Sequence, residues 1–343
     1  MKRALYLILT IAVLVTQACK KDNNTKNPLP GDAIDETPNE PYREWVVYNT
    51  TNSLLPNNQV NALAIDKNDI KWAGTANGLV RITGTKFTVF NTDNSPLPSN
   101  YITALAVEAD GTVWVGTDAG LARYKQSGWS VYKTTNSKLL DNTITCLTHD
   151  ALNGTTWVGT YGGFNQISKG TNWESFSELE DDMIYALATD NTGALWLGTF
   201  NPIGFKGRIL KFKDNAYTTI RLHDLGYTST HPYALTMDKN NKPLAVLTGT
   251  AVKAVVRING NSLEEVDRPE TAFGLKVILV EGDKIWVGGK TLNLFGDKQS
   301  PNINIPGTDA NIQAIAIDSK GRKWLGTIYG GLAVYNDHPA PAL

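Results

Sequence analysis

The sequence predicts an all-β fold, a seven-bladed β-propeller with four antiparallel strands in each blade. A motif centred on Trp, such as "VWVGTDAGLARY" around Trp114, recurs at intervals of 38 to 48 residues, which is typical of propellers and solenoids. Each interval holds four short β-rich runs separated by Gly, Asn and Asp turns. The last copy lacks its fourth run, and a match for that run stands at the other end of the chain. The motif positions are Trp72, Trp114, Trp157, Trp196, Leu244, Trp286 and Trp324, with Leu244 in a degraded fifth copy.

The four runs of a copy follow one order. An apolar first run, "VNALAID" at 60–66, is followed by a tight turn and by the strand that holds the Trp. A third run, such as "GLARY" at 120–124, precedes a short aromatic or β-branched fourth run. No segment after Tyr42 has a helical period, so we expect strands throughout. The expected fourth strands are 87–90, 129–132, 173–176 and 217–220.

The fourth strand of the last copy is expected at the N-terminal end. No aromatic run follows "KWLGTIYGGLAVYNDHPAPAL" at 323–343. The segment "EWVVYNTTNSLLPNNQV" has the same strand and following loop as "WSVYKTTNSKLLDNTI" at 129–144. We therefore predict that Trp45–Tyr48 completes the last blade. Such closure hides the two sheet edges that an open array would expose.

The repeated pattern over residues 45–335 resembles the two-component regulator propeller repeat, with its hydrophobic strand, D-x-x-G-like turn, W-x-G-T, G-L and closing aromatic strand. In that family such propellers form the periplasmic sensor half of hybrid histidine kinases in Bacteroidetes-like bacteria. The family chains continue into a further β domain, a membrane helix and a kinase. The resemblance thus implies a free-standing, Bacteroidetes-type lipoprotein relative of these sensor domains, and their signalling role is not carried over to it.

The N-terminal segment indicates export from the cytoplasm. Residues 1–18 have Lys2 and Arg3 before an apolar run that is too short to span a bilayer, as in a signal peptide. Cys19 follows the small residue Ala18, which resembles a bacterial lipobox with Thr16 where Leu is usual. We expect lipidation of Cys19, with ordinary cleavage after Ala18 as the alternative.

The expected organisation follows from these segments. A lipidated Cys19 and a polar, Pro-containing tether occupy 19–42, the propeller 43–338, and a short tail 339–343. The lipid would anchor the protein to the outer membrane, on its periplasmic or cell-surface side, and would be the only membrane contact. We expect a monomer in the cell envelope.

Composition and motif spacing argue against several other functions. The formal net charge of −1 gives no excess of positive charge for binding nucleic acid. The turns "DKNDIK" at 66–71 and "DKNNKP" at 238–243 are too short to wrap a calcium ion, so Asx turns are expected there. We expect no metal and no cofactor.

The sequence shows no convergent catalytic set. The four His residues occupy different repeat positions, and only His223 and His231 fall near each other in one blade. Cys146 lies within a predicted buried strand and is expected to be a small core residue. We therefore expect no catalytic residue and a binding module rather than an enzyme, with a lyase or hydrolase as the less favoured reading.

A binding site is expected on the face where the longer connections gather, such as 49–59, 91–101 and 200–207. Aromatic, amide and hydroxyl groups near the central channel suit a glycan or another small ligand. The alternatives are a docking scaffold for an envelope protein and a structural role in which the aromatic residues fill the blade junctions. The candidate ligand-binding residues are Tyr101, Asp118, Tyr161, Phe200, His231 and Tyr329.

Overall fold

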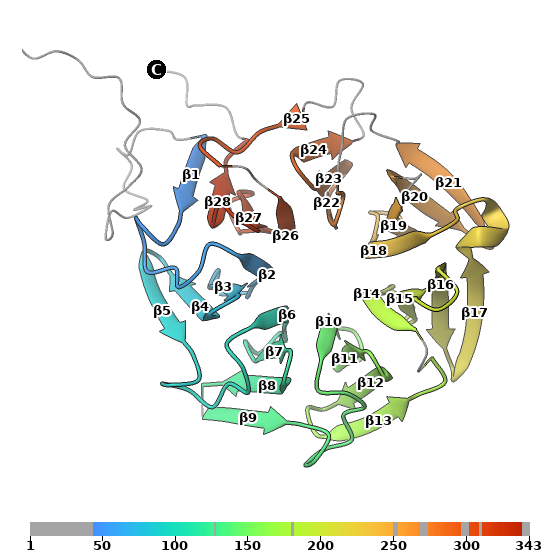
Figure 1. Ribbon diagram of the computed structural model, residues 1–343, viewed down its shortest axis with the longest axis horizontal. Coiled ribbons are helices and arrows are strands. Elements are labelled where there is room, and N and C mark those ends of the chain that lie inside the picture. The colour runs from blue at the N-terminus through green and yellow to red at the C-terminus, as the bar shows by residue number, and fades with distance from the viewer. Residues whose placement is uncertain are drawn as a thin grey trace, which may run out of the picture.

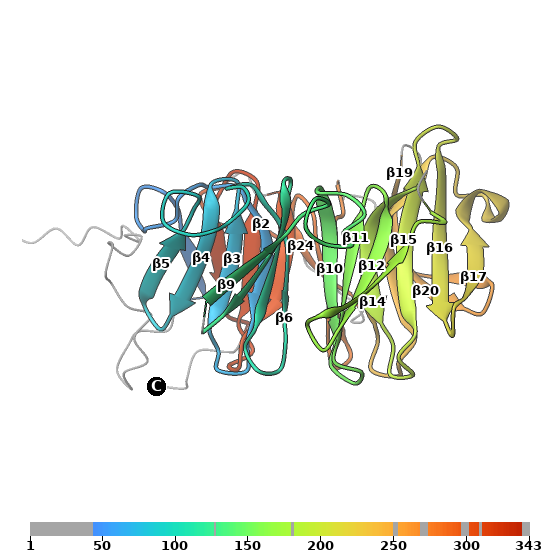
Figure 2. The same cartoon turned by 90° about the horizontal axis from the view of Figure 1, so that it is seen from below.

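The computed structural model describes residues 44–126, 128–179, 182–249, 253–267, 274–295, 302–308 and 311–337. In this part of the chain seven four-stranded antiparallel sheets form a ring, with strands such as β2 and β6 nearest the centre (Figure 1). Figure 2 shows the strands running between the two faces of the ring. The predicted all-β, seven-bladed propeller is confirmed. The leader at 1–18, the tether with Cys19 at 19–42 and the tail at 339–343 lie outside the described residues.

The first four blades follow the predicted strand order. Blade 1 has β2 (Val60–Ile65), β3 (Lys71–Thr75), β4 (Gly78–Thr83) and β5 (Lys86–Phe90). Blade 2 has β6 (Ile102–Val107), β7 (Val113–Thr117), β8 (Gly120–Lys125) and β9 (Gly128–Tyr132). Blade 3 has β10 (Ile144–Asp150), β11 (Thr155–Thr160), β12 (Gly163–Ser168) and β13 (Asn172–Phe176). Blade 4 has β14 (Met183–Thr189), β15 (Leu195–Asn201), β16 (Lys206–Lys213) and β17 (Ala216–Arg221).

The last three blades complete the ring. Blade 5 has β18 (Thr230–Met237), β19 (Pro243–Gly249), β20 (Lys253–Asn259) and β21 (Ser262–Asp267). Blade 6 has β22 (Val277–Glu281), β23 (Lys284–Gly288), β24 (Leu292–Phe295) and β25 (Asn302–Ile303). Blade 7 has β26 (Ile312–Ile317), β27 (Lys323–Thr327), β28 (Leu332–Tyr335) and the N-terminal β1 (Trp45–Tyr48). One element was not expected, a short 3-10 helix η1 (Leu222–Leu225) before β18.

The N-terminal strand closes the ring as predicted. β1 pairs antiparallel with β28, with Trp45 opposite Tyr335 and Tyr48 opposite Leu332. Val46, Val47 and Tyr48 are buried. The Tyr48 ring also stacks on Trp324, with 6.5 Å between the ring centroids. The closure therefore combines strand pairing with burial of the β1 side chains.

The Trp residues of the second strands pack between blades. Trp72 is buried together with Ile102 and Val113 of the next blade, in a cluster that joins blades 1 and 2. In four blades the indole Nε1 also donates a hydrogen bond to an acidic residue at the end of the preceding strand. The pairs are Trp114 with Glu108, Trp196 with Asp190, Trp286 with Glu281 and Trp324 with Asp318. These Trp residues thus combine packing between blades with a polar contact inside their own blade.

The glycine of the W-x-G-T motif sets the distance between neighbouring blades. A Cβ built on Gly74 would lie 2.5 Å from Ile102 Cγ2 of the next blade, and one on Gly116 would lie 2.6 Å from Ile144 Cγ2. The same holds at the ring closure, where a Cβ on Gly326 would lie 2.8 Å from Val60 Cγ1. The motif therefore needs glycine because a larger residue would push the next first strand outward.

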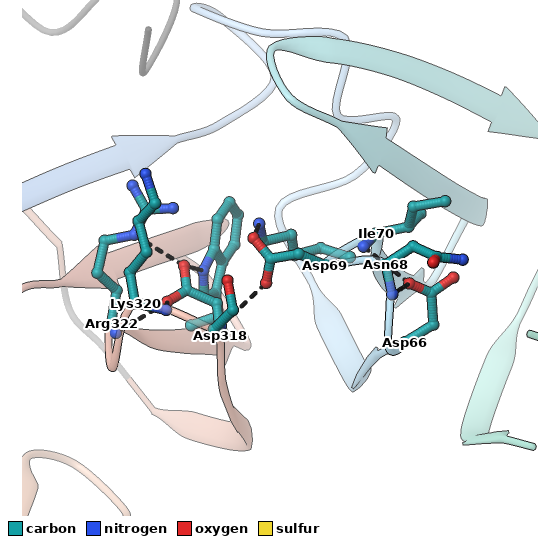
Figure 3. A network of polar contacts seen from close by, with 10 residues as sticks. Asp66, Asn68, Asp69, Ile70, Asp318, Lys320 and Arg322 are labelled. Atoms are coloured by element: carbon teal, nitrogen blue, oxygen red, sulfur yellow. Dashed lines mark hydrogen bonds and ion pairs between the residues drawn. The ribbon is translucent and has the colours of Figure 1, made fainter. Parts of the chain in front are cut away.

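The short turns that join the first and second strands of the blades lie on the face opposite the long loops. Figure 3 shows two of these turns side by side. Asp66 Oδ1 accepts hydrogen bonds from the backbone N–H groups of Asn68 and Ile70, both at 2.9 Å. The expected Asx turns are thus present. Asp69 of blade 1 also accepts a hydrogen bond at 3.0 Å from the backbone N–H of Ser319 in blade 7, so this turn supports the closure.

The first prediction concerns the closing strand. A chain beginning at Asn49 should be less stable than one beginning at Arg43, because it loses the β1–β28 pairing and the burial of Val46, Val47 and Tyr48. Burying a large apolar side chain contributes about 1.5–3 kcal/mol, so several kcal/mol of unfolding free energy should be lost. Urea unfolding of both chains measures the difference. Equal midpoints would show that β1 does not hold the ring together.

The second prediction concerns the motif glycine. Gly116→Ala should lower the unfolding free energy by about 1–3 kcal/mol, because its Cβ would overlap Ile144. Gly204→Ala is the matched control, since a Cβ there meets Lys206 atoms only at 3.5 Å or more. Urea unfolding should show a clear loss for the first variant and little change for the second. Similar losses in both would contradict the steric account.

The third prediction concerns Asp190. Burial alone would raise the pKa of its carboxyl, but hydrogen bonds from Thr192, Trp196 and the Ala194 backbone outweigh burial and lower the pKa from 3.8 to about 2. A lowered native pKa means that the ionised carboxylate stabilises the fold above pH 4, and that this contribution disappears as the pH falls to about 2.

Asp190→Asn should therefore cost about 2 kcal/mol of unfolding free energy at pH 7. The deficit should shrink between pH 4 and pH 2, where the wild-type carboxyl becomes protonated. Asp93→Asn, at an exposed loop position, is the control. Thermal unfolding across this pH range measures both effects, and a deficit that does not change with pH would exclude the charge as its source.

Candidate functional site

A cavity of about 420 Å³ opens on the face that carries the long loops. Tyr101 precedes β6, Asp118 lies in the β7–β8 turn, and Tyr161 lies in the β11–β12 turn. The sequence had indicated these three residues separately, and the structure brings them to one cavity between blades 2, 3 and 4. Its lining is Tyr101, Thr103, Asp118, Thr143, Ile144, Thr145, Tyr161, Met183, Ile184 and Tyr185. We call it the rim cavity.

The two tyrosines at the rim are partly exposed to solvent. Tyr101 is 39% exposed and Tyr161 is 44% exposed, and Asp118 is exposed as well. The Tyr101 hydroxyl accepts a hydrogen bond at 3.1 Å from Gln59 Nε2 of blade 1, which orients the ring. The rim cavity therefore offers aromatic faces and a carboxylate to a ligand.

Phe200 and His231 lie in an aromatic cluster beside the rim cavity. Phe200 is only 5% exposed, and His231 stacks on it with 3.6 Å between the ring centroids. Tyr185, which lines the rim cavity, contacts His231 edge-on at 5.5 Å. Neither Phe200 nor His231 lines the rim cavity itself. Phe200 is a packing residue of the kind that the structural alternative expected.

The environment of His231 favours its neutral form. Burial lowers the pKa of the imidazole from its ordinary value, although a hydrogen bond with the Thr248 carbonyl at 3.4 Å acts in the opposite direction. A neutral ring that stacks on Phe200 cannot act as a fixed positive charge. His231 therefore supports Tyr185 from the side by packing.

Tyr329 lies apart from the other candidates. It follows β27 on the same face and is 65% exposed. It is absent from the lining of the rim cavity. The structure thus brings together three of the six predicted residues, places two beside them, and leaves Tyr329 on the open surface.

Sequence reasoning missed a ring of side chains inside the central channel. In six first strands a β-bulge lies near the start of the strand, and bulges re-aim side chains. The residues at these bulges are Asn61, Thr103, Thr145, Tyr185, Tyr233 and Gln313, and Lys276 precedes β22 at the equivalent place in blade 6. We call these seven residues the channel ring. All of them line a second cavity of about 380 Å³.

The two cavities are adjacent and share three lining residues. Thr103, Thr145 and Tyr185 belong to the channel ring and also line the rim cavity. A signal for the ring was present in the sequence, because a polar or aromatic residue occupies the second position of first strands that are otherwise apolar, as Asn61 does in "VNALAID". Because the two cavities share these three residues, a ligand at the rim can also contact the channel ring.

The described residues show no metal-binding cluster. They contain no group of three or more His, Cys, Asp or Glu side chains that could hold a metal ion. Burial raises the pKa of the Cys146 thiol to about 12, so this thiol stays protonated. The residue packs against a core cluster but is only half-buried and also lines the channel cavity, so it is not the fully buried core residue that the sequence predicted. In the same part of the chain no helix has the length and apolar character needed to cross a membrane.

A comparison with protein families supports the repeat pattern. The model for the two component regulator propeller matches residues 96–119 and 178–201. These segments contain the first two strands of blades 2 and 4. No curated protein matches the sequence significantly.

Solved structures with the same fold include proteins of different function. The chain is 18% identical to the extracellular domain of a Bacteroides thetaiotaomicron protein described as a hybrid two-component system, with a TM-score of 0.66 over 82% of this chain. The match spans only 40% of that protein. Virginiamycin B lyase from Staphylococcus aureus is 15% identical, with a TM-score of 0.68 over 85% of this chain and 99% of the lyase.

A third structure, YCF48 bound to D1 peptide, is 12% identical, with a TM-score of 0.64 over 92% of this chain and all of the other. At these identities the likeness establishes the fold alone. The matched repeat segments and the sheet topology agree with one another. The chain is therefore a seven-bladed propeller with two segments, 96–119 and 178–201, that match the two component regulator propeller model.

Proposed function

We propose that the chain is a non-catalytic, extracytoplasmic binding protein, sensor-like in character, that takes a glycan or a similar small ligand in the rim cavity. The observation that carries the proposal is the convergence of Tyr101, Asp118 and Tyr161 on one cavity. These residues come from two blades and from loops far apart in sequence. Their convergence gives the site a defined shape rather than a scattered set of exposed side chains.

The chemistry of the rim cavity suits a sugar. Tyrosine faces stack on the C–H faces of sugar rings, while Asp118 and the threonine hydroxyls hydrogen-bond to sugar hydroxyls. A volume of about 420 Å³ lies within the usual range of small-molecule sites. The rest of the cavity wall is mostly apolar, and an apolar wall with a few polar groups is the usual make-up of a small-molecule site.

The proposed location rests on the leader and on the relatives. Residues 1–18 have the pattern of a signal peptide, and the similar B. thetaiotaomicron structure is an extracellular domain. Anchoring by a lipid on Cys19 belongs to the same proposal. Together they support a location where the propeller meets ligands from outside the cytoplasm.

A protein-docking role is the second candidate. The β15–β16 connection exposes Ile203 at 84% and Phe205 at 64% on the loop-rich face. Large exposed apolar residues are typical of protein interaction sites. Another propeller of this fold, YCF48, has been solved with a peptide bound. The likeness to the lyase keeps catalysis as a third reading, although the described residues that line the two cavities include no histidine and a single carboxylate, that of Asp118.

The fourth prediction tests the rim cavity. The soluble chain 43–343 is screened on an array of neutral and acidic oligosaccharides, and the tightest probe is taken to calorimetry. Tyr101→Ala and Tyr161→Ala should each weaken binding by about tenfold, because each removes a stacking face. Tyr329→Ala is the matched control, since this exposed tyrosine lies on the same face outside the cavity.

Three outcomes would contradict the proposal. Equal affinity of the wild type and both cavity variants, once circular dichroism shows that they are folded, would place the ligand elsewhere. Breakdown of the bound oligosaccharide during incubation would show that the protein is an enzyme. Loss of binding in the Tyr329 variant alone would move the site to the open surface.

A further inference from the structure

The channel ring contains one charged residue in an otherwise neutral set. Lys276 lies at the ring position of blade 6 and lines the channel cavity. In the described part of the chain its ammonium group has a single long hydrogen bond, to Gln313 Oε1 at 3.5 Å. The described residues that line this cavity include no carboxylate. The ammonium thus has no countercharge among these residues.

Other ring members also have unused hydrogen-bonding capacity. Thr103 Oγ1 is buried and has no hydrogen-bond partner among the described residues. The Tyr185 hydroxyl has only a weak contact with Met183 Sδ, at 3.8 Å. Buried polar groups normally have partners, so the Thr103 hydroxyl is available to hydrogen-bond to a polar group that enters the cavity.

A second tier of residues that line the channel cavity is apolar. Seven aliphatic residues two positions further along the first strands form this tier: Leu63, Leu105, Leu147, Leu187, Leu235, Ile278 and Ile315. Burial in these surroundings lowers the pKa of Lys276 from its ordinary value, because desolvation disfavours the charged ammonium. An anion beside Lys276 would offset that desolvation, and the low polarity of this tier would strengthen the attraction.

We propose that the ligand of the rim cavity carries an anionic group, a carboxylate or a sulfate, which enters the channel and pairs with Lys276. The inference rests on the proposed function, because it uses the residues that the two cavities share. The exposed Asp118 at the rim would repel a negative group there, which favours seating the acid group in the channel and the neutral ring on the tyrosines. The ligand class is thus an acidic saccharide.

The test compares acidic probes with neutral partners of the same shape. Uronic acid trisaccharides are paired with their methyl esters, and sulfated trisaccharides with their desulfated forms, so that the two arms separate carboxylate from sulfate. Calorimetry with the wild-type chain 43–343 should show that at least one acidic member binds about tenfold or more tightly than its neutral partner.

Substitutions assign this preference to Lys276. Lys276→Gln should abolish it, whereas Lys276→Arg should retain most of it because the charge remains. Lys133→Gln is the control, since Lys133 lies on the β9–β10 loop of the same face and outside both cavities. Circular dichroism and thermal unfolding establish that each variant is folded. A second measurement follows the Lys276 Cε resonance by NMR during titration with sodium sulfate, where a saturable shift is expected.

The outcomes separate this inference from the proposed function. Neutral and acidic probes that bind equally, with affinity that depends on Tyr101 and Tyr161 but not on Lys276, would overturn the anion site and leave the rim cavity standing. Acidic probes whose binding depends on Lys276 but not on the tyrosines would support the anion site and overturn the rim cavity. If no probe binds and sulfate does not shift the Lys276 resonance, both are wrong.

Discussion

The close approach of neighbouring blades at one glycine is the constraint on which the rest of the propeller depends. At Gly74, Gly116 and Gly326 a Cβ would lie within 2.8 Å of a side chain that begins the next first strand. Because each contact repeats between consecutive blades, it sets the spacing of the first strands around the channel. It also closes the ring, since Gly326 of the last blade meets Val60 of the first. The channel and the rim cavity exist in the space that this spacing defines.

The degraded fifth copy departs from this constraint. Val246 pairs with Ala234 at the place where the other copies have glycine, and the following blade begins its first strand without an assigned bulge. Lys276 stands at that junction, as the one basic member of the channel ring. The copy in which the repeat signature is weakest is therefore next to the ring position whose chemistry differs most from the others.

Much of the fold could be predicted because the information is local and repeated. The strand Trp45–Tyr48 can be predicted because its sequence, and that of the loop after it, resemble the strand Trp129–Tyr132 and its loop. The site was only partly predictable. Whether an aromatic residue on a loop faces a ligand depends on packing, so Tyr161 is exposed whereas Phe200 is buried under His231. The channel ring depends on bulges, which are a property of strand pairing rather than of any single residue.

The strand that closes the ring also determines how the protein would respond to force. Trp45, where the chain enters β1, lies opposite Tyr335, where it leaves β28. Tension between the two ends of the chain would therefore load the rungs of this ladder in succession, starting at Trp45, as a zipper opens. Shearing, by contrast, would load all the rungs at once. The β1–β28 pairing is thus a mechanically weak point, and β1 would peel away before other strands are strained.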